Sequence, residues 1–204
     1  MEDYDVQGRI LACATSLGAD LLIMGTHGRT GLGWLMLGSV TDKVLRTATC
    51  PVLTVPPAVM RAAKPPFKRV LCPVDFSEPS LHALRFALAL AQEGDARLTL
   101  LHVLPAPTPD DVVAMMGHRS RCEERARRRL ERLLPVASRT FCSPSSRVTW
   151  GAPPRSIVEV ANGEASDLIV MGVRQRGILE RMFVGSNASQ VVRHATCPVL
   201  TVKV

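Results

Sequence analysis

Residues 24–41 combine the residue types that can bind a phosphate group. They run from a predicted strand end (Met-Gly) through a glycine-rich loop to Gly-Ser at a predicted helix start. Glycines let the backbone come close to a ligand, and the free N–H groups at a helix N-terminus attract an anion. The candidate ligands in this segment are Met24, Gly25, Gly28, Gly38, Ser39, Val40 and Thr41.

Two common phosphate motifs do not fit this segment. Gly33-x4-Gly38-Ser39 has the glycine spacing of a P-loop but lacks its lysine, and Gly31-x-Gly33 has no third glycine to complete a dinucleotide fingerprint. A structural interpretation stays open, in which the glycines only form a turn and Ser39 pairs with Asp42 to cap the helix. Connections of this length in compact domains are usually functional or disordered, which favours a binding role.

The segment belongs to an internal repeat. Residues 48–55 (ATCPVLTV) return letter for letter as residues 195–202, and the match extends upstream without a gap to Met24-Gly25 and Met171-Gly172. The first occurrence ends only 55 residues into the chain, so it lacks its N-terminal half.

We interpret the chain as two unequal copies of one unit. Residues 1–55 are the C-terminal half of the unit (copy one), and residues 67–204 are a complete unit (copy two). Between them lies a basic segment, residues 56–66, in which prolines at both ends indicate a stiff linker.

The two copies differ in the glycine-rich loop. Copy two keeps Gly172, Gly185 and Ser186, but Gln175 replaces the second glycine and Asn187-Ala188 replaces the pair after the serine. If that position needs a positive φ, glutamine costs about 1–2 kcal/mol there, and its side chain crowds the phosphates. We therefore expect a weakened phosphate grip in copy two.

The spacing of apolar residues along the chain predicts an α/β fold around these loops. Short apolar β-branched runs alternate with segments whose apolar residues recur at helical spacing. Copy two predicts strands near 70–74, 98–103, 147–150, 168–171 and 199–202, with helices near 77–94, 110–134, 156–164 and 186–194. Copy one retains a helix containing Ile10, Leu11, Ala14 and Leu17, a strand at 21–24, a helix from Ser39 and a strand at 52–55. Strands separated by helices predict a parallel sheet covered on both faces.

Composition narrows the class of protein. The chain has 204 residues, of which 47% are hydrophobic and 21% charged, a balance that can bury a core. The longest apolar runs are far too short to span a bilayer, and the start is acidic where a secretory signal is basic. We therefore expect a cytoplasmic protein without a membrane partner.

The charged and thiol residues have plain structural interpretations. The formal charge of +7 is concentrated in residues 119–132, where arginines alternate with glutamates around a helical apolar stripe. This pattern is typical of a solvated helix face, and few aromatic residues lie near it, so we do not expect nucleic-acid binding. The six cysteines have no C-x-x-C spacing, and we interpret them as structural thiols, with Cys50 and Cys197 as small buried hydrophobes.

Several separated motifs, in this order, resemble the universal stress protein family. Gly25-x2-Gly28-x9-Gly38-Ser39 followed by Cys-Pro-Val-Leu looks like its ATP-binding signature. Copy two adds residues 70–77 (VLCPVDFS) and 100–103 (LLHV), which resemble its first two strands. The resemblance covers nearly the whole chain and implies a Rossmann-like, five-stranded parallel sheet with helices on both faces. It also implies dimers or tandem pseudo-dimers and nucleotide-dependent regulation of stress survival.

The resemblance divides the expected ligand residues between the copies. The acidic residue after strand one corresponds to Asp75, which follows Pro73 and Val74 and is expected near the ribose and adenine. The residue closing strand two corresponds to Val103, expected against the adenine. Copy two also carries Met171, Gly172, Gly185 and Ser186, whereas the complete phosphate signature is in copy one. The implied cofactor is ATP, with Mg²⁺ as its companion ion, and no resident metal site is expected.

Three functional interpretations remain. The first is a nucleotide-sensing regulatory module of the stress response. The second is a protein of the same fold that binds no nucleotide and works through dimerisation and partner docking. The third is a slow ATPase in which Asp75 helps to hold a metal. The sequence contains no G-x-S-x-G motif, so it gives no support to a hydrolytic triad.

The repeat also predicts how the copies assemble. The identical final strands, residues 52–55 and 199–202, should pair antiparallel about a pseudo-two-fold axis, within one chain or in a homo-oligomer, because unpaired apolar edges associate. Residues 21–24 should form an apolar edge, since copy one has no first strand to lie beside them. We expect a second chain, the linker or aggregation to cover that edge.

Overall fold

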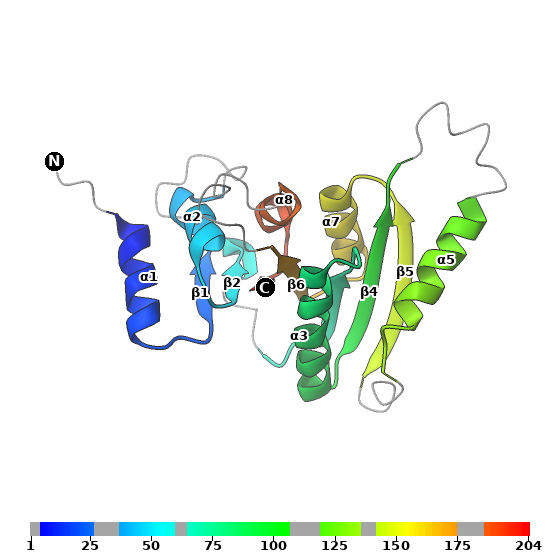
Figure 1. Cartoon of the computed structure of the whole chain (residues 1–204), viewed down its shortest axis with the longest axis horizontal. Coiled ribbons are helices and arrows are strands. Elements are labelled where there is room, and N and C mark those ends of the chain that lie inside the picture. The colour runs from blue at the N-terminus through cyan, green and yellow to red at the C-terminus, as the bar shows by residue number, and fades with distance from the viewer. Residues whose placement is uncertain (1–4, 27–36, 60–64, 107–118, 136–141, 175–185) are drawn as a thin grey trace.

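A computed structural model of the chain describes residues 5–26, 37–59, 65–106, 119–135, 142–174 and 186–204. In chain order the elements are α1 (Val6–Ser16), β1 (Leu22–Gly25), α2 (Ser39–Thr47), β2 (Val52–Val55), the 3-10 turn η1 (Pro57–Val59), β3 (Arg69–Pro73), α3 (Glu78–Gly94), β4 (Arg97–Leu104), α5 (Arg119–Glu131), β5 (Ser143–Trp150), α7 (Pro153–Gly163), β6 (Leu168–Val173), α8 (Ser186–His194) and β7 (Val199–Lys203). Figure 1 shows them along an elongated molecule, with α1 and α5 at opposite ends. Within the described ranges, no helix has the length and apolar character of a membrane span.

The strands form one seven-stranded sheet in the order β1-β2-β7-β6-β3-β4-β5. The expected five-stranded parallel unit is its larger part, from β7 to β5, and copy one adds β1 and β2 at the β7 edge. The α/β class and the Rossmann-like arrangement are therefore confirmed. The sheet as a whole has more strands than the family pattern implies, because copy one extends it.

The two copies join through their final strands, as the repeat predicts. β2 and β7 are antiparallel, with Val52 opposite Thr201, Leu53 opposite Leu200 and Thr54 opposite Val199. Two buried threonine hydroxyls make reciprocal hydrogen bonds across this pair: Thr54 Oγ1 donates to the Val199 carbonyl and Thr201 Oγ1 donates to the Val52 carbonyl, both at 3.1 Å. The local two-fold axis therefore passes between Leu53 and Leu200.

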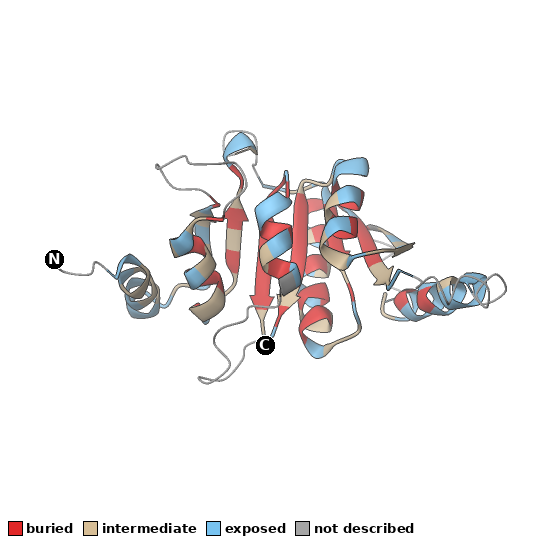
Figure 2. Cartoon of the chain, turned by 90° about the horizontal axis from the view of Figure 1, so that it is seen from above, coloured by how far each residue is buried: buried red, intermediate tan, exposed pale blue. Residues whose placement is uncertain are grey.

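Helices cover the sheet in two layers. On one face α7, α8 and α2 pack over residues such as Leu71, Leu101 and Ile169. On the other face α3 and α5 pack over residues such as Val70 and Leu100. Successive strand residues alternate between the two cores, as expected for a sheet buried on both sides. Figure 2 shows the central strands buried and much of α1 and α5 exposed.

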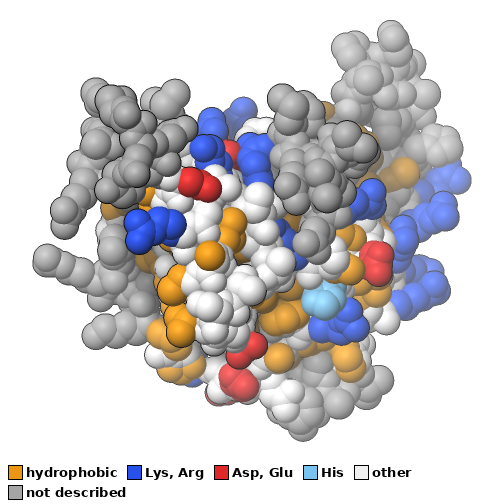
Figure 3. Space-filling view, turned by 60° about the vertical axis from the view of Figure 1, so that its left-hand side comes forward, with side chains coloured by type: hydrophobic (Ala, Val, Ile, Leu, Met, Phe, Trp, Pro, Cys, Tyr) orange, Lys and Arg blue, Asp and Glu red, His pale blue; other side chains and the backbone are white. Residues whose placement is uncertain are grey.

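Copy one is only half covered. α1 has no fully buried residue, and Leu17, expected on its apolar stripe, is 76% exposed. β1 is an edge strand, and Ile23 on it is 65% exposed, which agrees with the expected apolar edge. Figure 3 turns this end of the molecule forward and shows hydrophobic side chains open on its surface. Copy one has no counterpart of β3 and α3, the elements that bury the equivalent strand β6 in copy two.

The cysteines only partly match expectation. None of the six, all of them described, forms a disulfide; Cys72, Cys142 and Cys197 are buried and Cys13 and Cys122 are exposed. Cys50 was expected to be buried like Cys197 but is half-exposed. It lines a shallow hollow between α1 and α2, because the thinner packing of copy one leaves it partly uncovered.

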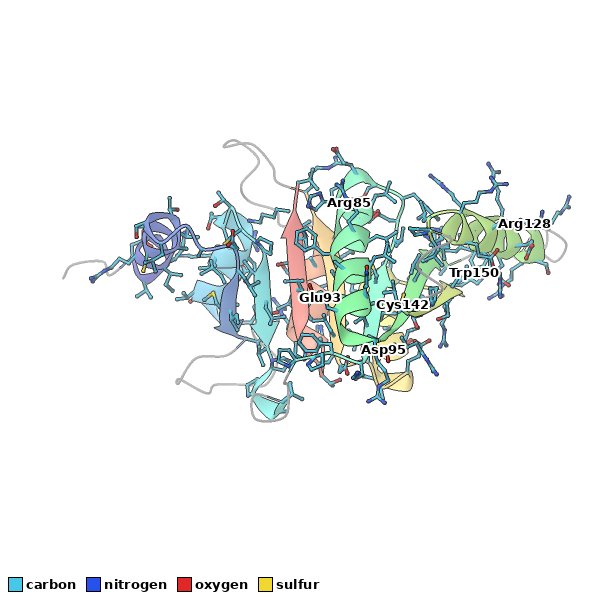
Figure 4. The ribbon with its side chains drawn as sticks, turned by 90° about the horizontal axis from the view of Figure 1, so that it is seen from below. Arg85, Glu93, Asp95, Arg128, Cys142 and Trp150 are labelled. Atoms are coloured by element: carbon cyan, nitrogen blue, oxygen red, sulfur yellow. The ribbon has the colours of Figure 1, made fainter. Side chains whose placement is uncertain are left out.

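The arginine-rich segment forms α5, a surface helix over β5. Arg128 projects outward and pairs with Glu124 at 2.6 Å, whereas Trp150 lies on the strand below (Figure 4). The Arg119 guanidinium lies 5.1 Å from the centre of the Trp150 ring. The apolar side of α5 is formed by Ala126 and Leu130, both buried. These contacts agree with a solvated helix face; the part of the predicted helix before residue 119 lies outside the described residues.

Candidate functional site

A hollow of about 270 Å³ opens at the carboxyl ends of β3, β4 and β6. The first turns of α3, α7 and α8 complete its walls. Helix starts and parallel strand ends meet at the same edge of the sheet, which is where open α/β sheets bind ligands. The hollow is lined by Pro73, Val74, Asp75, Ser77, Pro79, Ser80, Leu101, His102, Val103, Pro153, Ile157, Met171, Gly172, Val173, Arg174, Asn187 and Ala188.

Asp75 presents a carboxylate at the mouth of this hollow. Its Oδ1 accepts hydrogen bonds from the Ser77 backbone N–H at 2.9 Å and from the Ser77 hydroxyl at 2.5 Å. Burial alone raises the pKa of Asp75, but the two hydrogen bonds from Ser77 help to outweigh it, and the pKa is lowered overall. The group is therefore ionised at neutral pH and can accept further hydrogen bonds, for example from sugar hydroxyls.

His102 fixes the turn that carries Asp75. Its Nδ1 lies 2.7 Å from the Val74 carbonyl oxygen, and because a carbonyl only accepts, Nδ1 carries the proton. The imidazole also contacts the Phe76 ring, with the two ring centroids 4.7 Å apart. The Arg129 guanidinium lies over the same Phe76 ring, 3.8 Å from its centroid. Phe76 has a left-handed φ of 65°, which these contacts hold in place. The partner of His102 is thus the backbone of the turn that follows β3.

Gly172 has a packing role in the structure. A Cβ built on it overlaps the carbonyl oxygen of Pro79 and lies 2.6 Å from the Ser80 nitrogen. The first turn of α3 therefore rests directly on the end of β6, and only glycine leaves room for it. The sequence assigned Gly172 to close approach of a ligand, whereas here the closest group is protein backbone.

The predicted residues of copy one lie elsewhere, at the end of β1 and the start of α2. Met24 is half-buried, Gly25 is exposed, and Val40 packs against the core. Thr41 is buried, and its hydroxyl donates to the Gly25 carbonyl at 2.9 Å, which ties the helix start to the strand end. Ser39 is exposed at the first residue of α2. None of these residues lines the hollow of copy two.

The helix cap proposed as a structural alternative does not form. The N-cap of α2 is Gly38, which makes no side-chain cap hydrogen bond. Asp42 instead pairs with Arg46 one turn later, at 2.8 Å. The Asp42 carboxylate thus accepts from Arg46 Nε at 2.9 Å and from Ser189 Oγ at 3.4 Å. Gly28 and Gly185 lie outside the described residues, and Ser186 is placed only as the first residue of α8.

The hollow unites six of the predicted residues and adds others. The six are Pro73, Val74, Asp75, Val103, Met171 and Gly172. Four of these others were not predicted from the sequence: Ser77, which hydrogen-bonds to Asp75, and Ile157, Arg174 and Asn187 in the lining. Their shared signal is position, since each lies just after a strand or in the first turns of a helix. No group of three or more metal-ligating side chains occurs in the described part of the chain.

A sequence profile of the universal stress protein family matches residues 1–56 and 66–203. A universal stress protein of Methanocaldococcus jannaschii is 30% identical over 154 residues, covering 72% of this chain and 88% of the relative. Another, from Thermus aquaticus, is 36% identical over 142 residues, covering 67% of this chain and 99% of the relative. Both alignments are long enough to carry the family assignment.

Solved structures show the same fold over a longer chain. A Pseudomonas aeruginosa protein of unknown function superposes with a TM-score of 0.71 at 22% identity, covering 97% of this chain and 68% of its own. A universal stress protein of Archaeoglobus fulgidus gives a TM-score of 0.65 at 22% identity, covering 97% and 66%. The chain thus spans about two thirds of these two structures.

Proposed function

Because the chain belongs to the universal stress protein family, we propose that it is a cytoplasmic regulatory module of the stress response that senses adenine nucleotides. We assign the ligand to the hollow of copy two, residues 67–204, and regard residues 1–55 as a truncated copy joined by the linker 56–66. The observation that carries this proposal is the ionised Asp75 beside apolar walls at the carboxyl edge of the sheet.

The lining suits the parts of a nucleoside. Val103, Met171 and Ile157 supply apolar surface for a flat base, and Asp75 accepts hydrogen bonds from ribose hydroxyls. The N-terminus of α8 adds a partial positive charge for a phosphate. Asp75 is the one carboxylate in the described lining, so a Mg²⁺ ion would rely on the nucleotide phosphates for most of its ligands.

The test is a titration of the protein with a fluorescent ATP analogue, for the wild type and for Asp75→Asn. Losing a charged hydrogen-bond partner should weaken binding by about tenfold or more. Glu93→Gln is the control, since Glu93 is an exposed carboxylate on α3, away from the lining of the hollow (Figure 4). Equal affinity of all three proteins, or no binding at millimolar nucleotide, would contradict the proposal.

A second function is favoured by the open end of the sheet. Ile23 and Leu21 are 65% and 43% exposed at the edge formed by β1. An apolar strand edge of this kind is an association site. Copy one can therefore serve partner docking or homo-oligomer formation without any nucleotide. Protein that assembles equally with and without nucleotide, while binding none, would favour this function over nucleotide sensing.

A further inference from the structure

The phosphate end of the copy-two hollow differs chemically from the copy-one loop. Gln175 stands where copy one has Gly28, and a residue with a side chain allows less close approach of a polyphosphate to the backbone than glycine does. At the neighbouring positions copy two has Arg174 and Asn187, where copy one has His27 and Val40. Copy two thus has a guanidinium and an amide where copy one has an imidazole and an aliphatic side chain.

Both side chains lie where a phosphate would enter. Arg174 directly follows β6, Asn187 is the second residue of α8, and both are exposed and line the hollow. Arg174 makes no ion pair or hydrogen bond with any other described residue. Its five N–H donors are therefore not engaged by the described protein, and Asp75, just after the adjacent strand β3, supplies the opposite charge in the lining.

We propose that Arg174, with Asn187, binds the single phosphate of a nucleoside monophosphate in copy two, so that this site prefers a mononucleotide to ATP. This inference rests on the proposed nucleotide site. A guanidinium grips one phosphate through two parallel hydrogen bonds, whereas a chain of phosphates needs several backbone donors spaced along a loop. The amide of Asn187 adds one more donor at the positive end of α8.

The size of the hollow points to the same ligand class. Its volume of about 270 Å³ lies just below the usual range of ligand pockets, about 300–1,000 Å³. A base and a ribose occupy much of that space. A single phosphate then lies at the Arg174 rim, and further phosphates extend beyond the lining residues.

The experiment is calorimetric titration with adenosine, AMP, ADP and ATP against the wild type, Arg174→Gln, Arg174→Lys and Arg128→Gln. Arg128→Gln is matched in charge and lies on the outer side of α5, far from the hollow (Figure 4). We expect the wild type to bind AMP at least as tightly as ATP. Arg174→Gln should weaken AMP about tenfold or more and leave adenosine unchanged. Arg174→Lys should be intermediate, because it keeps a point charge without the fork.

The results separate this inference from the function it rests on. If adenosine binds, but Arg174→Gln leaves AMP affinity unchanged or ATP binds tenfold tighter than AMP, the phosphate assignment to Arg174 is overturned and the nucleoside site stands. If none of the four compounds binds the wild type, both are overturned. Circular dichroism and urea midpoints equal to the wild type show that the variants are folded.

Discussion

Gly172→Ala tests how tightly the hollow of copy two is built. An added Cβ overlaps the Pro79 carbonyl oxygen and approaches the Ser80 nitrogen to 2.6 Å. Both atoms are backbone at the start of a 17-residue helix that packs over β6, so neither can yield as the tip of a flexible side chain can. The methyl group must therefore displace the first turn of α3 or the end of β6.

The expected cost is about 2–3 kcal/mol of unfolding free energy, the upper part of the range for overpacked sites, because backbone must move. Gly163→Ala is the matched control. Gly163 ends α7 with nothing within 4 Å of its would-be Cβ and no positive φ, so alanine should stabilise by up to about 1 kcal/mol.

Urea unfolding of both variants, followed by circular dichroism, measures the difference as a change in midpoint at constant slope. A displaced α3 start also moves Asp75, so adenosine affinity should fall in Gly172→Ala and not in Gly163→Ala. Gly172→Ala as stable as the wild type would refute the packing role of this glycine. If Gly172→Ala lost adenosine affinity without losing stability, Gly172 would instead serve the close approach of a ligand, as its sequence position suggests.

Three further outcomes are expected. Ile23→Lys places a charge on the open β1 edge, so it should lower the apparent mass seen by light scattering at micromolar concentration; an unchanged, monodisperse monomer in both proteins would contradict association through this edge. Burial lowers the pKa of Lys203 to about 8, below its unfolded value, so the folded state binds this proton less and stability should rise as pH increases from about 8 to 10.5. Lys203→Met should reduce that rise, measured by urea midpoints across this range, and an identical pH dependence would argue against it. A maleimide should label exposed Cys13 in the native protein but Cys72, whose pKa burial raises to about 12, only after unfolding; mass spectrometry of timed aliquots distinguishes them.

Local patterns predicted most of the elements. The strand 52–55 and the helix 186–194 have the predicted bounds. In each, a short segment with regularly spaced apolar residues is bounded by residues that end a strand or helix. β5 begins at Ser143, whereas the sequence predicted a start at Arg147. The first half of the strand (SPSS) was missed because it lacks the apolar run that identifies a buried strand. Those residues are strand because β4 offers a full-length parallel neighbour, from Arg97 opposite Ser143 to Leu104 opposite Trp150. A pairing between distant segments leaves no trace in local composition.

Burial and the site were harder to predict. The helical spacing of apolar residues in α1 predicted a helix, but it could not predict how exposed that helix is. The exposure depends on elements that copy one lacks. Family resemblance identified Asp75, which follows β3, and Val103, near the end of β4; both strands are recognisable in the sequence. It could not identify Arg174, whose relevance depends on β6 lying beside β3, or the contact of Gly172 on β6 with Pro79 at the start of α3. Side-chain partners of this kind become visible only when the topology is known.

The symmetric junction of β2 and β7 has a consequence for how this chain meets other copies of itself. The same strand sequence stands on both sides of the two-fold axis, so either strand fits the matching strand of another molecule equally well. The covalent linker changes the competition, because a short tether holds the partner strand at an effective concentration in the millimolar range. At protein concentrations well below that range we expect the junction to close within one chain, as it does in the structure, and exchange between molecules to be a minor process. We then expect the β1 edge to be the place where assembly responds to concentration.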